Sequence, residues 1–285
     1  MTRYAEVIGD PIAQSKSPAI HGYWLEKLGL DADYRHCLVH AAELEGYLTK
    51  RAADPDWLGC NVTMPHKQAV MPHLARLDPL AEKVGAVNTI VREADGSLTG
   101  YNTDVAGFLE PLQDELAKQH YFRMARIIGT GGAARAIIVG LLEHGLTLVV
   151  AGRNTAKAQG LLDELGAGEG HHVAPLDHFA EASDFQFDDR EGCFDLVVNA
   201  SALGMVGQPP LALDFSHVPP GSVVYDIVTA PLDTPLLEEA RAQGLRTVDG
   251  LSMLIGQAAV AFEKFFGAAP PRVDGDAELR RILTQ

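Results

Sequence analysis

The first part of the chain alternates short apolar runs with segments of helical period. Between Ala5 and Thr63 the apolar runs are AEVIG, YRHCLV and WLGCNVT, and the segments between them are AIHGYWLEKLGL and AAELEGYLTKRA. Short apolar runs predict buried strands, whereas apolar residues spaced three and four apart predict amphipathic helices. This alternation indicates an α/β domain.

A second alternating series follows Arg123. Its apolar runs are MARIIG, LTLVVAG, FDLVVNAS and SVVYDIV, and the helical segment ARAIIVGLLEHG lies between the first two. The polar stretch 166–192 is predicted to be rich in loops. LSMLIGQAAVAFEKFFG predicts a last helix, because its apolar residues form one stripe at helical spacing. We therefore expect two α/β domains with a cleft between them.

Composition narrows the class of protein. The 285 residues are 47% hydrophobic and 21% charged, which suits one or two soluble globular domains. A formal net charge of −15 argues against binding to nucleic acid or to an anionic membrane surface. Cys37, Cys60 and Cys193 form no CxxC pair, so neither a disulfide framework nor a metal site is expected. Without a targeting pattern or a long apolar run, the protein is expected in the cytoplasm.

GTGGAARA, residues 129–136, follows an apolar run and opens a predicted helix. In that context the pattern G-x-G-x-x-G/A indicates a dinucleotide site. Gly129 would allow the tight turn, Gly131 the approach of the pyrophosphate, and Ala134 close packing of the helix. The helix N-terminus would offer unpaired N–H groups to the phosphates. The alternative is an ordinary glycine-rich turn.

The end of the next predicted strand bears on the choice of cofactor. It reads AGRNTAK, with Arg153 and Lys157 where a free ribose 2′-hydroxyl is usually met by Asp or Glu. Cations there could pair with a 2′-phosphate, so the pattern favours NADP over NAD. The alternative is two solvated surface cations.

Polar residues also stand at the ends of predicted strands. In NVTMPHK, Asn61 and Thr63 share one face of a strand, because side chains alternate with period two. In AQSKSP, Ser15 and Ser17 share a face if the chain is extended, and Ser17 before Pro18 is predicted as an N-cap. Two hydroxyls beside a helix start indicate a carboxylate site.

Lys67 is predicted in the first turn of a helix that begins at Pro65, where the helix dipole disfavours a cation. GAVNTI contributes Asn88, and GYNTD contributes Asp104 where a strand meets a helical segment. Singly these residues can be read as a solvated cation, a turn residue and a cap. Jointly they are polar groups at strand ends, where open α/β sheets bind ligands.

Eight strings of the sequence, in this order, resemble the shikimate dehydrogenase family over nearly the whole chain. They are GDPIAQSKSPAIH, GCNVTMPHK, GAVNT, GYNTD, GTGGAARA, NASALGM, DTPLL and DGLSMLIGQAAVAF. The resemblance implies a substrate-binding domain of residues 1–106, completed by C-terminal helices in 250–285, and a Rossmann-type NADP-binding domain of residues 107–249. It implies reversible hydride transfer between NADPH and 3-dehydroshikimate, which gives shikimate. We expect a monomer or homodimer.

The same resemblance implies the roles of individual residues. Lys67 and Asp104 are the implied catalytic pair. The substrate residues implied are Ser15 and Ser17 for the carboxylate, Asn61, Thr63, Asn88 and Gln257 for the hydroxyls, and Thr229 at a position where the family usually has a tyrosine. The cofactor residues implied are Gly129, Thr130, Gly131, Gly132, Ala133, Gly152, Arg153, Asn154, Lys157, Ile227 and Gly250.

These implied roles suit the chemistry. Hydride delivery to a ketone leaves negative charge on its oxygen, which needs a proton donor or a fixed cation nearby. A helix N-terminus would disfavour the charged form of Lys67, and Asp104 would hold the lysine in place.

The chain departs from the family pattern at Thr229, at Gly22, where asparagine is common, and at Gly152–Arg153–Asn154, where Asn-Arg-Thr is common. Thr229 motivates quinate or aminoshikimate dehydrogenase as an alternative. A dinucleotide or quinate sensor without catalysis is a second alternative, against which the presence of both Lys67 and Asp104 speaks.

Overall fold

The computed structural model describes residues 2–184, 186–187, 190–272 and 276–285. Its contacts divide the chain into two compact units. Unit 1 consists of residues 1–107 and 254–285, and unit 2 of residues 108–253. The chain leaves unit 1 within helix α4 (Asp104–Leu109) and returns to it within helix α9 (Gly250–Phe266).

Unit 1 is built on a six-stranded mixed sheet with the order β2-β1-β3-β5-β6-β4. Strand β1 is parallel to β2 and β3, β5 is antiparallel to β3 and β6, and β4 is parallel to β6. The strands are β1 (Arg3–Gly9), β2 (Ala32–Leu38), β3 (Trp57–Val62), β4 (Arg76–Leu77), β5 (Thr89–Arg92) and β6 (Leu98–Tyr101).

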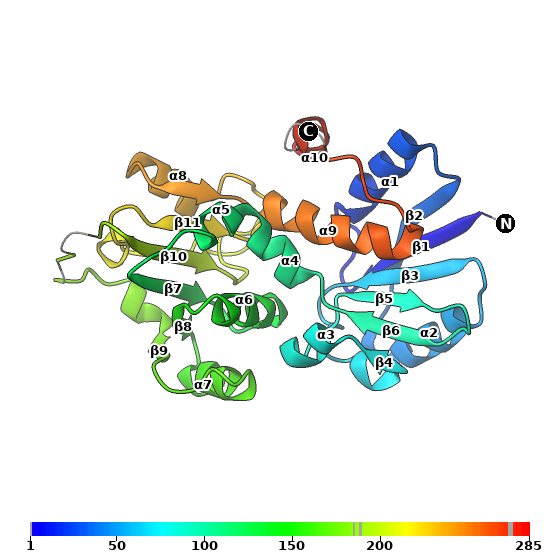
Figure 1. Ribbon diagram of the computed structural model, residues 1–285, viewed down its shortest axis with the longest axis horizontal. Coiled ribbons are helices and arrows are strands. Elements are labelled where there is room, and N and C mark those ends of the chain that lie inside the picture. The colour runs from blue at the N-terminus through cyan, green and yellow to red at the C-terminus, as the bar shows by residue number, and fades with distance from the viewer. Residues whose placement is uncertain (1, 185, 188–189, 273–275) are drawn as a thin grey trace. The chain divides into compact units, whose positions relative to one another are not determined.

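Helices cover both faces of the unit 1 sheet (Figure 1). Besides parts of α4 and α9, they are α1 (Ser17–Leu28), η1 (Ala41–Glu43), α2 (Leu44–Ala52), η2 (Met71–His73), α3 (Pro79–Val84) and α10 (Ala277–Leu283). Leu48 of α2 and Ala81 of α3 share one apolar cluster with Cys60 of β3. On the other face, Trp24 of α1 meets Phe262 of α9 edge to face, with ring centroids 5.5 Å apart. The sheet is therefore buried between two helical layers.

Unit 2 is built on a six-stranded sheet with the order β12-β11-β10-β7-β8-β9, all parallel. The strands are β7 (Phe122–Ile128), β8 (Thr147–Gly152), β9 (His172–Pro175), β10 (Cys193–Asn199), β11 (Val223–Asp226) and β12 (Arg246–Val248). Counted from β7, this is the order 3-2-1-4-5-6 of a dinucleotide-binding fold. The predicted α/β class and Rossmann-type topology are confirmed.

Side chains also bury both faces of the unit 2 sheet. The helices are η3 (Glu110–Leu112), α5 (Gln113–Leu116), α6 (Gly132–Glu143), α7 (Thr155–Glu164), η4 (Leu176–Phe179), η5 (Phe215–His217) and α8 (Pro235–Ala242). Val197 and Val224 pack in one cluster with Leu237 of α8. Tyr225 points to the opposite face, where its ring stacks on Phe108 at a centroid distance of 4.9 Å. Burial on both faces explains why these strands read as continuous apolar runs.

The helix predicted from Pro65 is wrong. Residues 64–70 form turns, and only the short helix η2 follows. The Lys67 carbonyl accepts a hydrogen bond from Val87 N at 2.8 Å, while Met71 N bonds to Gln68 at 3.2 Å. Pro72 has no N–H and would clash with the carbonyl four residues earlier in a helix. Lys67 therefore lies in a turn, and no helix dipole acts on it.

The polar stretch 166–192 contains one short strand, β9, and the short helix η4. The sequence did not indicate β9, because its four residues HVAP carry too few apolar positions to show a period. Within this stretch, residues 185 and 188–189 lie outside the described residues. Among the helices that the structure describes, none is long and apolar enough to cross a membrane.

Candidate functional site

Lys67 and Asp104 form the centre of the polar groups in unit 1. Lys67 Nζ donates to Asp104 Oδ2 at 2.5 Å, and the two side chains are 19% and 6% exposed. A carboxylate that is so nearly buried is costly unless a charge or several donors compensate it. The ammonium of Lys67 supplies that compensation and keeps one edge open to solvent.

Asn88 holds the other oxygen of this carboxylate. Its Nδ2 donates to Asp104 Oδ1 and to Thr103 Oγ1, both at 2.9 Å, and lies 3.3 Å from Gln257 Oε1. Its Oδ1 accepts from Thr103 N at 2.7 Å. Asp104 is thus fixed between a cation and an amide, and Gln257 of α9 reaches the same cluster.

Asn102 explains why Asp104 is free for this pairing. Its Oδ1 accepts from the backbone N–H groups of Asp104 and Val105 at 3.1 and 3.4 Å, which is the bonding of an N-cap to α4. Its Nδ2 donates to Ala86 O at 2.9 Å. Asn102 therefore has the capping role that the sequence analysis considered for Asp104. The preference for asparagine at N-caps could have indicated Asn102 from the sequence.

Ser15 and Ser17 lie together where the loop after β1 meets the start of α1. Ser15 Oγ is 3.2 Å from Ser17 Oγ and accepts from Ser17 N at 3.3 Å. The expected N-cap role of Ser17 is wrong: it is the first residue of α1, and Lys16 takes the N-cap position without a side-chain bond. Lys16 is helical rather than extended, so the two hydroxyls meet because Ser15 folds over the start of the helix.

Asn61 and Thr63 lie at the carboxyl end of β3. Asn61 Oδ1 accepts from Tyr34 OH at 2.6 Å, and Asn61 Nδ2 donates to Thr89 Oγ1 at 3.0 Å. Thr63 N donates to Ile8 O at 2.9 Å, which carries the pairing with β1 one step beyond the strand. Asn61 and Thr63 therefore lie at the same edge of the sheet as the end of β1, which leads to Ser15 and Ser17.

Unit 1 thus contains eight of the nine residues expected to contact substrate or catalyse. They are Ser15, Ser17, Asn61, Thr63, Lys67, Asn88, Asp104 and Gln257. The ninth, Thr229, belongs to unit 2 and follows β11. Sequence reasoning missed Tyr34, Thr89 and Thr103, whose hydrogen bonds reach residues far away in the chain and have no local signature.

The glycine-rich turn of unit 2 joins β7 to α6. Gly129 has φ +127, and a Cβ there would lie 2.6 Å from Ala200 O, so the turns after β7 and β10 touch and exclude a side chain. Gly131 takes the N-cap position of α6, and a Cβ on it would meet nothing within 4 Å. Open backbone at a helix start between these two strands fits a pyrophosphate.

The segment after β8 contains the candidate cations. Arg153 and Lys157 are exposed, while Asn154 caps α7 by accepting from Lys157 N at 3.0 Å. A Cβ on Gly152 would lie 3.2 Å from Thr130 Cγ2, so the turns after β7 and β8 are also adjacent. A cavity of about 470 Å³ opens here; its lining residues are Arg153, Pro175, Leu176, Asp177, Ala180, Leu203, Pro210 and Ala212.

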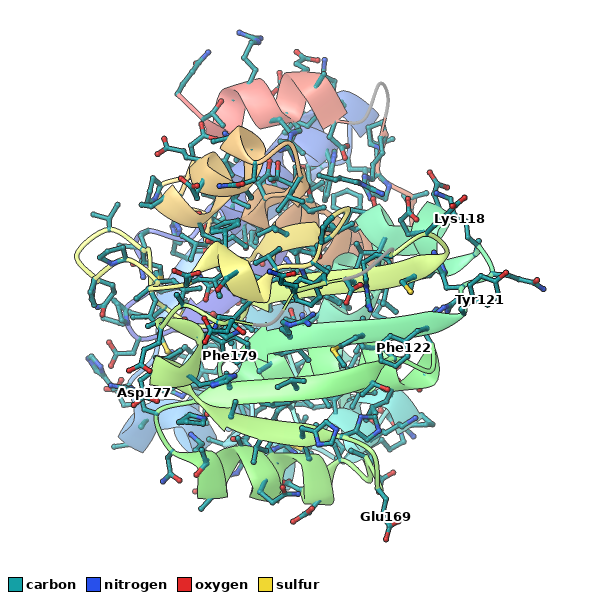
Figure 2. All side chains as sticks on the ribbon, turned by 90° about the vertical axis from the view of Figure 1, so that its left-hand side faces the viewer. Lys118, Tyr121, Phe122, Glu169, Asp177 and Phe179 are labelled. Carbon is teal, nitrogen blue, oxygen red and sulfur yellow. The ribbon has the colours of Figure 1, made fainter. Side chains whose placement is uncertain are left out.

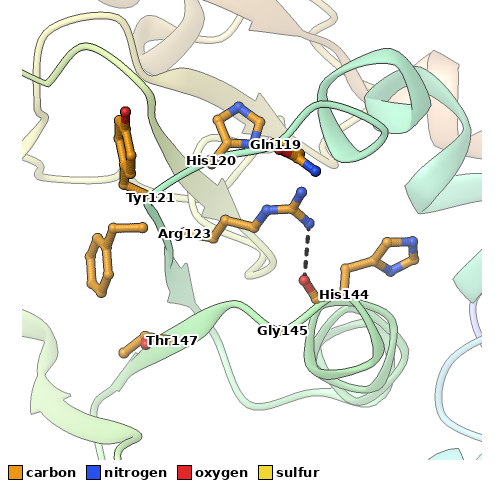
Figure 3. Close-up of a pocket in the computed structure, with 8 residues that line it drawn as sticks. Gln119, His120, Tyr121, Arg123, His144, Gly145 and Thr147 are labelled. Atoms are coloured by element: carbon orange, nitrogen blue, oxygen red, sulfur yellow. Dashed lines mark hydrogen bonds between the residues drawn. The ribbon is translucent and has the colours of Figure 1, made fainter.

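A second cavity of about 470 Å³ lies at the amino end of β7 (Figure 3). Arg123 in it donates to the carbonyls of His144 at 3.1 Å, Leu116 at 3.1 Å and Lys118 at 2.5 Å. Figure 2 shows Phe122 at one end of this sheet and Asp177 and Phe179 at the other. Because sheets of this type bind ligands at their carboxyl ends, we do not assign this cavity to the cofactor.

Asp226 organises the loop that carries Thr229. The fully buried carboxylate accepts from Asn199 Nδ2 at 3.0 Å, Val228 N at 3.0 Å and Thr234 Oγ1 at 2.7 Å. Burial raises the pKa of Asp226, and these hydrogen bonds act in the opposite direction. The end of β10, the loop after β11 and the start of α8 are therefore tied to one side chain.

Gly250 holds the other side of that loop. A Cβ there would lie 2.5 Å from Ile227 O and would also overlap the Val228 carbonyl. Only glycine permits such an approach between the loop and the first residue of α9. Ile227 and Gly250, both expected at the cofactor, are thus brought into contact.

Two family models match the chain. Residues 7–90 match the shikimate dehydrogenase substrate binding domain, and residues 250–274 match the shikimate 5′-dehydrogenase C-terminal domain. The chain is 51% identical over 281 residues to the shikimate dehydrogenase (NADP(+)) of Sphingopyxis alaskensis, covering 98% of this chain and 96% of that protein. The chain belongs to the shikimate dehydrogenase family.

Solved structures of the shikimate dehydrogenase family and its relatives share this fold. The Thermus thermophilus enzyme in complex with NADP(H) and shikimate is similar at 34% identity and a TM-score of 0.80, with 99% of each chain covered. The quinate dehydrogenase of Corynebacterium glutamicum in complex with NAD is similar at 32% identity and a TM-score of 0.83, with 100% of this chain and 99% of that chain covered.

His21 of α1 packs against Tyr34, the hydrogen-bond partner of Asn61. Its fully buried ring stacks on Tyr34 with centroids 3.9 Å apart and planes 3° apart, and among the described residues neither ring nitrogen has a hydrogen-bond partner. Burial lowers the pKa of His21 to about 3. The ring therefore stays neutral in the folded protein.

The low pKa of His21 predicts a loss of stability in mild acid. Below pH 6.5 His21 binds a proton in the unfolded chain but not in the folded protein. The contribution of His21 to the free energy of unfolding is therefore fully present above pH 6.5 and decreases as the pH falls toward 3. Between pH 7 and 5, the free energy of unfolding of the wild type should fall about 2 kcal/mol more than that of His21→Phe. Urea unfolding at both pH values measures this; the exposed control His73→Phe should follow the wild type. An equal fall in His21→Phe would contradict the assignment.

Proposed function

We propose that the protein catalyses the reversible NADP-dependent reduction of 3-dehydroshikimate to shikimate, a step of aromatic amino-acid biosynthesis. The observation that carries the proposal is the Lys67–Asp104 pair, a cation and a carboxylate 2.5 Å apart among clustered hydroxyl and amide groups. The relative from Sphingopyxis alaskensis bears the name of this activity, and the Thermus thermophilus relative was solved with both shikimate and NADP(H).

Lys67 and Asp104 are the proposed catalytic residues. Bound NADPH supplies the hydride to the ketone carbon. As negative charge develops on the ketone oxygen, Lys67 stabilises it and donates a proton, so the products are the alcohol and NADP⁺. Asp104 holds the ammonium in place, and Asn88 fixes Asp104 in turn. In the reverse direction Lys67 accepts the proton of the hydroxyl.

The remaining polar residues of unit 1 are proposed to bind the substrate. Ser15 and Ser17, with hydroxyls 3.2 Å apart beside a helix start, suit a carboxylate. Amide and hydroxyl groups donate and accept hydrogen bonds, as ring hydroxyls require. The residues proposed to contact the hydroxyls are Asn61, Thr63, Asn88 and Gln257, with Thr229 contributed by unit 2.

The cofactor residues are proposed in unit 2. The tight turn at Gly129 and the open N-terminus of α6 suit the pyrophosphate, and the mainly apolar cavity beside Arg153 suits the adenosine. The proposed set is Gly129, Thr130, Gly131, Gly132, Ala133, Gly152, Arg153, Asn154, Lys157, Ile227 and Gly250. Asn154 acts mainly by capping α7, which sets the position of Arg153 beside it.

A cytoplasmic location accompanies this proposal, because Cys37, Cys60 and Cys193 are all free thiols. The chain is proposed to act as a monomer or homodimer. A sensor without catalysis is disfavoured by the intact Lys67–Asp104 pair, and wild-type turnover of any substrate would exclude it.

Quinate dehydrogenase is the second candidate, because Thr229 stands where the family usually has a tyrosine and a quinate dehydrogenase is among the similar structures. Steady-state rates with shikimate and quinate, each with NADP⁺ and NAD⁺, decide between them. We expect the highest kcat/KM with shikimate and NADP⁺. A higher kcat/KM with quinate than with shikimate would identify the protein as a quinate dehydrogenase instead.

Lys67→Met should abolish most of kcat. General acid–base catalysis contributes roughly a hundredfold to ten-thousandfold, so kcat should fall at least about a hundredfold while the Kd for NADP⁺ changes little. The control is Lys27→Met, an exposed lysine of unit 1 that pairs with Glu278. Thermal melting checks folding, because removal of the ammonium leaves Asp104 without its cation. An unchanged kcat would remove Lys67 from the mechanism.

Arg153→Ala should weaken NADP⁺ selectively over NAD⁺. Hydrogen bonds to charged groups contribute about 1.5 to 3 kcal/mol, so the ratio of the two KM values should shift roughly tenfold to a hundredfold toward NAD⁺. Arg241→Ala is the control, because this arginine of unit 2 is also exposed and pairs with Asp233. If both cofactors weakened equally, Arg153 would have no role in reading the 2′-phosphate.

A further inference from the structure

Tyr34 is a buried residue of β2 that stands directly behind the proposed substrate groups. Its hydroxyl donates to Asn61 Oδ1 at 2.6 Å, across 27 positions of sequence. The Tyr34 hydroxyl therefore contacts a residue proposed to bind the substrate hydroxyls.

The hydrogen bonds of Asn61 leave little freedom to its amide. Both hydrogens of Nδ2 have acceptors, Thr89 Oγ1 at 3.0 Å and Asn88 O at 3.3 Å. Oδ1 has two lone pairs, one of which accepts from Tyr34. The amide orientation is thus set from both ends, and the second lone pair of Oδ1 remains available to a hydroxyl of a ligand.

Tyr34 is held as a donor in one place. Burial raises the pKa of Tyr34 well above its usual value, and the Cys60 and Glu6 side chains act in the same direction. The phenol therefore keeps its proton. The parallel stack on His21, with planes 3° apart, and the tilted contact with Phe265 at 6.4 Å hold the ring.

We propose that Tyr34 is a positioning residue for substrate binding, whose hydroxyl orients the Asn61 amide toward one ring hydroxyl of a cyclic hydroxy acid. The inference rests on the proposed function of this site. Tyr34 itself touches no reacting atom. It acts through the Asn61 side chain of β3.

Tyr34→Phe tests the proposal, because it removes the hydroxyl and keeps the stacked ring. KM for shikimate should rise about tenfold, equivalent to about 1.4 kcal/mol, because the lost orientation weakens substrate and transition state alike. We expect kcat and KM for NADP⁺ to stay within about twofold of wild type. A purely structural role would instead lower the melting temperature and kcat and leave KM unchanged.

Tyr47→Phe is the matched control. Tyr47 is a partly buried tyrosine of unit 1, and its hydroxyl donates to Glu6 Oε2 at 2.7 Å, in a cluster that contains none of the proposed substrate residues. Tyr47→Phe removes a tyrosine hydrogen bond of similar length to that of Tyr34 and should leave KM for shikimate unchanged. An equal rise of KM in both variants would overturn the role of Tyr34.

A double-mutant cycle separates action through Asn61 from a general loss of order. Shikimate binding to Asn61→Ala and to Asn61→Ala/Tyr34→Phe is measured by calorimetry in the presence of NADP⁺. If Tyr34 acts mainly through Asn61, the second substitution changes Kd less than about threefold in that background. A full tenfold change there would contradict the coupling. Absence of wild-type turnover with shikimate would instead defeat the proposed function.

Discussion

The Asp104 carboxylate must be compensated wherever it is buried, and the polar cluster of unit 1 is arranged to do so. Lys67 takes one oxygen and Asn88 the other, so neither partner can move without leaving a charge or an amide unsatisfied. Asn88 extends this constraint to Thr103 and Gln257. The geometry of the cluster is therefore determined by one ion pair and is not the sum of independent contacts.

Alternating patterns in the sequence predicted the fold class because strands and helices of α/β units have distinct periods. The context of GTGGAARA, after an apolar run and before a helix, predicted the parallel second sheet. The helix expected at Pro65 failed because a distant backbone group, Val87 N, takes the carbonyl that the helix needs. A local pattern cannot reveal such a bond. Pro72, however, is a residue that a longer helix from Pro65 could not have accommodated in its interior.

Some residues of the candidate site could also be found from the sequence, and others could not. Residues at the carboxyl end of a strand, such as Asn61, or just after one, such as Asp104, could be found because topology brings strand ends together. Tyr34 could not, because it lies inside β2 and its partner is 27 positions away. Asp226 ends β11, but its partner Asn199 is also 27 positions away, on β10. Asn102 is an intermediate case. Its capping bonds are local, but the sequence analysis considered Asp104, two residues later, as the cap.

Gln257, Phe262 and Phe265 lie in the part of α9 that belongs to unit 1, although they follow unit 2 in the chain. During synthesis, unit 2 emerges as one continuous stretch and has all of its strands before residue 254 is made. The aromatic layer of unit 1 over Trp24 and His21 stays incomplete until α9 has been made. Unit 2 can therefore fold while unit 1 still lacks part of its core.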